Sequence, residues 1–238
     1  MTETPILKLE DVHSYYGRAH ILADVSLGVR PGEVVALMGR NGAGKSTTMK
    51  CIMGLVTTAK GAILFQGKDV SHEPPHRISQ SGLAYVPEDR RIFTELSVLE
   101  NLEVGRQPVR ADAPFWTPER LFELFPNLGE MRNRPGGQMS GGEQQMLTIA
   151  RSLMGNPSMI LLDEPSEGLA PVIVEQMANT IRDLKAEGLT VLLSEQNLHF
   201  ATLVSDRAFI IEKGRIRYEG TMAELAANEE VRHAYLTV

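Results

Sequence analysis

The chain has 238 residues, of which 42% are hydrophobic and 23% are charged, a composition that suits a packed core and excludes a disordered or fibrous protein. Its 24 basic and 30 acidic residues give a net charge of −6 without any block of Lys and Arg, which argues against a nucleic-acid partner. The single cysteine, Cys51, excludes an internal disulfide and fits a reducing compartment. No apolar run approaches the ~20 residues of a membrane span, and the first residues lack a signal-peptide layout, so we expect a cytoplasmic chain.

The first thirty residues predict antiparallel strands with one buried face. Apolar and polar or charged residues alternate around Leu7 and Leu9, and again around Val25 and Leu27. Tyr16 lies between these two runs and ahead of a glycine-rich segment. Its ring could stack on an adenine base, but a strand tyrosine could equally pack on its neighbours. The sequence leaves both roles open.

Residues 39–46 match the phosphate-binding loop pattern G-x-x-x-x-G-K-[ST] at every specified position. An apolar strand is predicted before the loop at 34–38, and an amphipathic helix with a buried stripe from Met49 to Val56 follows it. In such a loop, Lys45 reaches the β- and γ-phosphates and the Ser46 hydroxyl can ligate Mg²⁺. A chance glycine-rich turn is the alternative, and both flanks argue against it. The predicted contact residues are Gly39, Arg40, Asn41, Gly42, Ala43, Gly44, Lys45, Ser46 and Thr47.

Residues 92–155 predict a helical insert within an α/β chain. A predicted strand ending near Glu88 precedes the insert, and a capping box at Ser97 and a Thr-Pro pair at Thr117 begin helices within it. Helical periodicity there replaces strand alternation. We expect one domain over residues 1–238, with a core from 1–91 and 156–238 and a helical subdomain from 92–155 that contacts another molecule.

A second pair of glycines begins a helix within this insert. Ser140 is followed by Gly141, Gly142 and Glu143, and the apolar spacing after them predicts a helix. Ser140 and Glu143 fit a capping box, which is one interpretation. Two glycines add nothing to a cap, and they leave backbone N–H groups accessible to an anion, so binding of a phosphate is the other.

An apolar run at residues 159–162 predicts a strand covered on both faces, and it ends in Asp163 and Glu164. Ligands bind at the carboxyl ends of parallel strands, so these acids would meet the phosphate loop. Asp163 can hold the Mg²⁺ that Ser46 contacts, and Glu164 can orient or deprotonate an attacking water. Two solvated acids that cap the next turn are the alternative.

The order of these parts resembles the nucleotide-binding subunit of an ATP-binding cassette (ABC) transporter, over about residues 7–220. Residues 139–145 resemble the LSGGQ signature of that family, with Met for Leu and an inserted acid. The resemblance implies an α/β P-loop NTPase with a mixed or parallel core sheet, an N-terminal antiparallel β subdomain and an inserted α-helical subdomain.

The family resemblance also implies a dimer that encloses two molecules of ATP with Mg²⁺. In that family the signature of one subunit binds the γ-phosphate of ATP held by the other. Tyr16 would then stack on adenine, and residues 167–170 would cross to the partner. The implied signature contacts are Ser140, Gly141, Gly142 and Glu143.

Four segments resemble the LivF-type ATPase of branched-chain amino acid importers: residues 86–93, 142–146, 165–171 and 195–197. This resemblance implies a motor for amino acid uptake at the inner face of the cell membrane. Its implied partners are an unlike second ATPase, two integral-membrane permease subunits and, indirectly, a periplasmic or extracellular substrate-binding protein. The segment from 88 to 93 and the insert would form the groove for a permease loop.

Several alternatives stay open. Importers with these motifs also carry urea, short-chain amides and other amino acids, and an ATPase subunit does not touch the cargo. A soluble cassette ATPase that acts on ribosomes or DNA usually has two cassettes or a long insertion, and this chain has neither. A regulatory protein that binds ATP without turnover is a third class, against which Glu164 argues.

Two residues depart from the general family pattern. Glu88 stands where most cassettes have a glutamine that contacts Mg²⁺ and the attacking water, and Gln196 stands where most have the switch histidine. We expect both to act at the catalytic site, and we expect Glu88 to contact Mg²⁺ as well. Glutamine donates a hydrogen bond but cannot take a full positive charge, so stabilisation of the transition state should be weaker there. His199 is a possible substitute, although a surface histidine is the simpler interpretation. We hypothesise that the two sites of the dimer hydrolyse ATP unequally.

Overall fold

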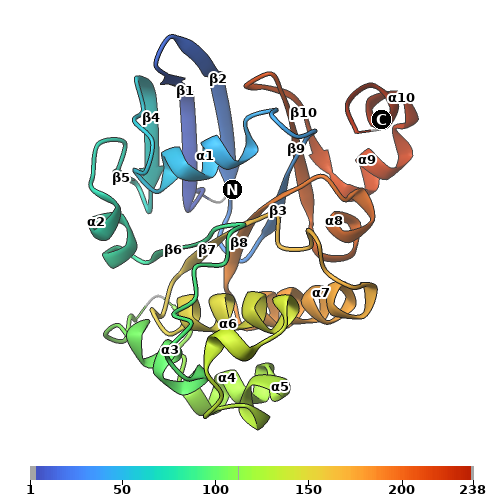
Figure 1. Ribbon diagram of the computed structural model, residues 1–238. Coiled ribbons are helices and arrows are strands. Elements are labelled where there is room, and N and C mark those ends of the chain that lie inside the picture. Colours follow the sequence, from blue (N-terminus) through green and yellow to red (C-terminus); the bar gives the residue numbers. More distant parts are fainter. Residues whose placement is uncertain (1–3, 112, 237–238) are drawn as a thin grey trace.

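The computed structural model describes residues 4–111 and 113–236, and its strands form two sheets (Figure 1). Residues 1–3, part of the amino-terminal segment discussed above, lie outside the described residues. One sheet is antiparallel, as the sequence predicts, and pairs Leu7 with Val29 and Leu9 with Leu27. All four of these side chains are buried. The strand order in this sheet is β2 (Ala19–Val29), β1 (Leu7–Tyr16), β4 (Lys60–Phe65), β5 (Lys68–Asp69).

The second sheet is mixed, as expected for a P-loop NTPase. Its order is β10 (Arg215–Thr221), β9 (Arg207–Glu212), β3 (Val34–Met38), β8 (Thr190–Glu195), β7 (Met159–Asp163), β6 (Leu83–Val86). β10 is antiparallel to β9, and the other neighbours are parallel. Every residue of β3 is buried, and its side chains alternate between a core on each face of the sheet. The carboxyl ends of β3, β7 and β8 therefore lie together at one edge of the sheet.

Helices cover both faces of the central sheet (Figure 1). α1 (Lys45–Ile52) shares a core with the amino-terminal strands. On the opposite face, α6 (Gly141–Leu153), α7 (Pro171–Ala186) and α8 (Leu198–Val204) contribute to the other core. α2 (Pro75–Gln80) lies between β5 and β6 in the chain, and α9 (Met222–Ala227) and α10 (Glu229–Tyr235) follow β10.

The segment between β6 and β7 contains α3 (Val98–Val104), α4 (Pro118–Leu124), α5 (Pro126–Glu130), a 3-10 turn (Gly136–Gln138) and α6. Figure 1 shows α3, α4 and α5 grouped on the far side of α6 from the amino-terminal sheet. The caps predicted from Ser97 and Thr117 are present at α3 and α4. The exact division into core and subdomain stays a prediction. Among the described helices, none is both long enough and apolar enough to cross a bilayer.

The helix after the phosphate loop is shorter than the sequence predicts. The apolar spacing predicts a helix that continues to Val56, whereas α1 ends at Ile52 and Met53 is its C-cap. Gly54 follows with φ of +66°, and a Cβ there would lie 2.6 Å from the carbonyl oxygen of Glu73. The chain therefore turns in contact with another backbone segment, and Val56 packs on the same core from outside the helix.

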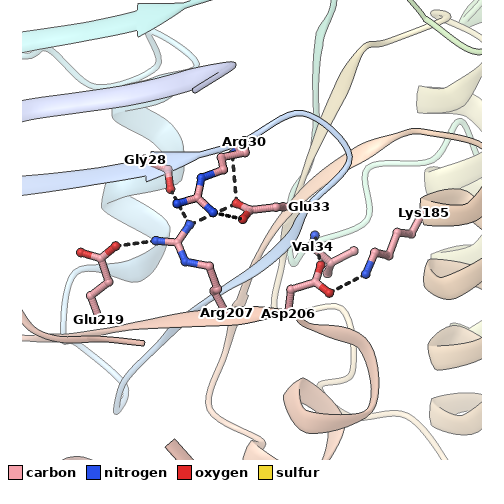
Figure 2. Close-up of polar contacts among 8 residues, drawn as sticks. All are labelled: Gly28, Arg30, Glu33, Val34, Lys185, Asp206, Arg207 and Glu219. Carbon is pink, nitrogen blue, oxygen red and sulfur yellow. Dashed lines mark hydrogen bonds and ion pairs between the residues drawn. The ribbon is translucent and has the colours of Figure 1, made fainter. Parts of the chain in front are cut away.

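A polar network holds the strands on either side of the start of β3 (Figure 2). Arg207 of β9 donates to the carboxylate of Glu33 at 3.1 Å and also pairs with Glu219 of β10. The Asp206 carboxylate accepts the N–H of Val34 at 2.9 Å. The Arg207 and Glu33 side chains are each only 15% exposed, so salt screens this pair less than a surface pair. The network positions the strand that leads into the phosphate loop.

Candidate active site

The phosphate loop connects β3 to α1 in a conformation that requires glycine. Gly39 has φ of +157°, and a Cβ there would lie 2.3 Å from the carbonyl oxygen of Ile211. Gly44 is the N-cap of α1 with φ of +116°, and its Cβ would lie 2.9 Å from the side chain of Leu22. Both glycines let the loop lie close to neighbouring strands while the first turn of α1 directs its N–H groups at the loop.

Lys45 lies at the centre of the site. Its ammonium donates to the carbonyl oxygens of Gly39 at 2.7 Å and Arg40 at 3.2 Å, and it pairs with the Glu164 carboxylate at 2.9 Å. The Lys45 side chain is only 4% exposed. The phosphate loop and the acid after β7 are thus joined by one buried cation, which can exchange these partners for phosphate oxygens.

Asp163 and Ser46 lie within hydrogen-bonding distance of each other. The Ser46 hydroxyl donates to Asp163 Oδ1 at 3.0 Å, across the boundary between α1 and β7. One hydroxyl and one carboxylate are oxygen donors, which Mg²⁺ prefers. These two residues are two of the three predicted magnesium ligands, and the third, Glu88, lines the cavity beside Ser46. The role of all three as magnesium ligands stays a prediction.

Two side chains that hold Asp163 were not recognised from the sequence. The Tyr85 hydroxyl of β6 donates to Asp163 Oδ2 at 2.9 Å, and the Ser194 hydroxyl of β8 donates to Oδ1 at 2.6 Å. Burial, followed by the negative charge of Asp163, raises the pKa of Tyr85 well above its usual range, so it stays a donor. No local pattern in the sequence indicates these contacts, because they depend on which strands are neighbours in the sheet.

Glu164 is a buried acid in an uncommon backbone conformation. It is 6% exposed and has φ of +49°. Its N–H donates to the hydroxyl and the carbonyl oxygen of Ser194, each at 3.1 Å, which holds this conformation. Burial raises the pKa of Glu164 although the ammonium of Lys45 opposes the shift. Oε1 faces Lys45, and Oε2 is buried without a hydrogen-bond partner among the described residues. A carboxylate with one unused oxygen and a raised pKa can accept a proton from water.

A cavity of about 480 Å³ opens beside these groups. Tyr16 at the end of β1 is 49% exposed and lines it, together with Glu88 and Glu167. An exposed ring beside the loop suits stacking on a base better than packing inside the sheet, but the adenine contact stays a prediction. Gln196 is exposed directly after β8. The loop residues that line the cavity are Asn41, Gly42, Gly44, Lys45, Ser46 and Thr47.

The Ser-Gly-Gly segment at 140–142 does not line the cavity beside Lys45 and Glu164. The Ser140 hydroxyl accepts the N–H of Glu143, and the Glu143 carboxylate accepts the N–H of Ser140 at 2.7 Å, so the capping box is present at α6. The glycines also serve packing, because a Cβ on Gly142 would lie 2.8 Å from Ile173 of α7. Gly142 and Glu143 line a separate hollow beside α5 and α7.

A phosphate loop at the end of β3, with acids at the end of a nearby parallel strand, defines a P-loop nucleotide-binding protein. The chain belongs to the ABC transporter family, whose model matches residues 22–167. It is 45% identical to the high-affinity branched-chain amino acid transport ATP-binding protein BraG of Pseudomonas aeruginosa, over 97% of this chain and 99% of BraG. It is 37% identical to the lipopolysaccharide export system ATP-binding protein LptB of Haemophilus influenzae, over 97% of each chain.

Solved structures of cassettes have the same fold. The ADP conformation of MJ1267, an ATP-binding cassette of an ABC transporter, superposes with a TM-score of 0.82 at 29% identity, over 97% of this chain and 98% of that one. The family and fold expected from the sequence are therefore confirmed.

Proposed function

We propose that this chain is the ATP-hydrolysing motor subunit of an importer for branched-chain amino acids. The observation that carries the proposal is the buried assembly in which Lys45 joins the phosphate loop to Glu164. When ATP binds, Lys45 turns from the loop carbonyls to the β- and γ-phosphates, and Glu164 accepts the proton of the attacking water. Ser46 and Asp163 would hold Mg²⁺, which would neutralise charge on the phosphates when bound. Glu88 completes the polar rim of the cavity.

Two chains are needed to complete each site in this proposal. The phosphate loop lines one hollow of the chain, and Gly142 and Glu143 of the Ser140 to Glu143 segment line another. The loop and the segment would therefore meet the same nucleotide only across an interface between two chains. By the family resemblance, the loop at 167–170, which follows Glu164, would cross to the second chain. That second chain is an unlike ATPase, by the resemblance to the LivF type.

A groove beside Phe93 is the proposed contact with the permease subunits. Phe93 and Val104 are 46% and 53% exposed, and both line this groove with Tyr85 and Arg151. The Arg151 guanidinium lies over the Phe93 ring at 5.1 Å, and its Nη1 is buried without a hydrogen-bond partner among the described residues. Exposed apolar side chains around such a donor suit a permease loop with an acceptor group. The chain would thus work on the inner face of the cell membrane, with the helical segment transmitting movement.

The cargo proposal rests on similarity to BraG, which is greater than the similarity to LptB. In cells whose only copy of this chain carries Glu164→Gln, uptake of labelled leucine should fall at least about tenfold, since general-base catalysis supplies about 10²- to 10⁴-fold. Uptake of urea, measured in parallel, should not change. Unchanged leucine uptake beside lost urea uptake would reject the amino acid cargo, and export of lipopolysaccharide is the alternative that LptB suggests.

Restoring a histidine at position 196 tests the proposed weakness of this site. In the assembled transporter, Gln196→His should raise ATP turnover about threefold or more, because an imidazolium stabilises developing charge on the γ-phosphate better than an amide does. Gln196→Asn, which keeps an amide, should give no increase. The rate of phosphate release gives the ATP turnover of both variants. An unchanged rate in the histidine variant would contradict unequal hydrolysis.

A further inference from the structure

We propose that Glu195 is a positioning residue that ties the loop after Glu164 to the segment carrying Gln196, so that the two move together. This inference rests on the proposed function. Glu195 is the last residue of β8 and is 1% exposed. Its Oε1 accepts the N–H of Ser166 at 3.0 Å, and its Oε2 accepts the N–H of Asn197 at 3.2 Å. One carboxylate thus bonds the backbone on both sides.

The two bonds bracket the groups that the mechanism uses. Ser166 lies two residues after Glu164, at the start of the loop proposed to cross to the partner. Asn197 lies directly after Gln196, so the bond from its N–H closes a tight turn around Gln196. A displacement of the loop at 166–170 would pull on Oε1 and transmit the movement to Gln196 through Oε2.

Ser194, the residue before Glu195 in β8, hydrogen-bonds to both Asp163 and Glu164. Its hydroxyl donates to Asp163 and accepts the N–H of Glu164. The last two residues of β8 therefore hold the whole turn from Asp163 to Ser166. Ser194 fixes the acids themselves, whereas Glu195 holds the segment that must move when a partner docks.

Burying a carboxylate costs desolvation free energy, even when the carboxylate accepts hydrogen bonds from two N–H groups. Burial raises the pKa of Glu195 to about 7, the bonds from Ser166 and Asn197 oppose the shift, and the charge of Glu164 adds to it. A neutral amide offers one acceptor oxygen, whereas a carboxylate offers two in one plane. The need for two acceptors at one point explains why a carboxylate is kept here despite its cost.

The variant Glu195→Gln tests the tie, because its single oxygen can serve one N–H while its NH₂ group faces the other donor. In hydrogen exchange on the nucleotide-free chain above pH 7, where Glu195 is mainly ionised, the amides of Ser166 and Asn197 should both exchange at least about tenfold faster, since each loses a hydrogen bond to a charged acceptor. The maximal rate of ATP hydrolysis should fall at least about tenfold. The KM for ATP should stay within about twofold, because Lys45 and the phosphate loop are unchanged.

Thermal stability separates positioning from a structural role. The folded-state pKa of Glu195, about 7, lies above its unfolded value, so its favourable contribution is full at low pH and is lost as pH rises through 7. Glutamine does not titrate. The melting temperature of the variant relative to the native chain should therefore rise between pH 5 and pH 8 while turnover stays low. A residue that only supports the fold would lose melting temperature and turnover together.

The control is Glu175→Gln, an exposed Glu on α7 away from this turn. It should change neither exchange, turnover nor the pH dependence of melting. If the amides of Ser166 and Asn197 exchange at the native rate in Glu195→Gln, the proposal that Glu195 ties the two segments is wrong. If the variant hydrolyses ATP at the native rate, Glu195 has no role in hydrolysis. If the assembled transporter that contains the native chain hydrolyses no ATP, the proposed function fails, while the exchange of the two amides still decides the tie.

Discussion

Replacing Glu164 with glutamine is expected to lower the rate of ATP hydrolysis by about 10²- to 10⁴-fold, the range for loss of a general base. Glutamine keeps the size of the side chain, and it can still accept a hydrogen bond from Lys45, but it cannot take a proton from water. ATP affinity should stay within a few-fold, because the phosphate loop does not depend on this carboxylate. Phosphate release and binding of a fluorescent ATP analogue measure the two quantities separately.

The interpretation depends on the buried position of Glu164. Glu164 is buried with an unused Oε2, whereas Glu88, another acid of the cavity, is exposed. Glu175→Gln again serves as the matched control and should hydrolyse ATP at the native rate. Near-native hydrolysis by Glu164→Gln would show that another group activates the water, and Glu88 would be the first to test.

The parts of the site that a local pattern specifies could be predicted from the sequence. A phosphate loop is formed by contiguous residues between a strand and a helix, so a short stretch of sequence is enough to predict it. The same holds for the capping boxes at Ser97 and Ser140, which involve residues three apart. Asp163 and Glu164 could be placed because a fully apolar run predicts a buried strand, and ligands bind at the ends of such strands.

The supporting contacts could not be predicted, because they depend on which strands are neighbours. Tyr85 bonds Asp163 across 78 positions and Ser194 bonds it across 31. The order of β6, β7 and β8 in the sheet brings Tyr85, Asp163 and Ser194 together. The hydrophobic pattern of each strand does not predict that order. The early end of α1 also involves a distant contact, since the chain turns at Gly54 close to the backbone of Glu73. The sequence thus identifies the groups at the site but not the residues that hold them.

Replacing Lys45 with methionine is expected to weaken ATP binding at least about tenfold, since hydrogen bonds to a charged group are worth about 1.5–3 kcal/mol each. It should also destabilise the nucleotide-free chain. The Lys45 and Glu164 side chains are 4% and 5% exposed, and removing one member of a buried pair typically costs about 3–5 kcal/mol. Chemical denaturation measures the stability, and titration with a fluorescent ATP analogue measures the affinity.

The double variant Lys45→Met with Glu164→Gln separates these two effects. Most of the cost in the single Lys45 variant comes from leaving the Glu164 carboxylate buried without its cation, so neutralising that carboxylate should restore most of the lost stability. It should restore no ATP affinity, because the phosphates still lack the ammonium. Equal stabilities of the single and double variants would mean that Glu164 is already neutral in the resting chain, and that Lys45 is held by the loop carbonyls of Gly39 and Arg40 alone. Hydrolysis would then need ATP to draw Lys45 away before Glu164 could act as a base.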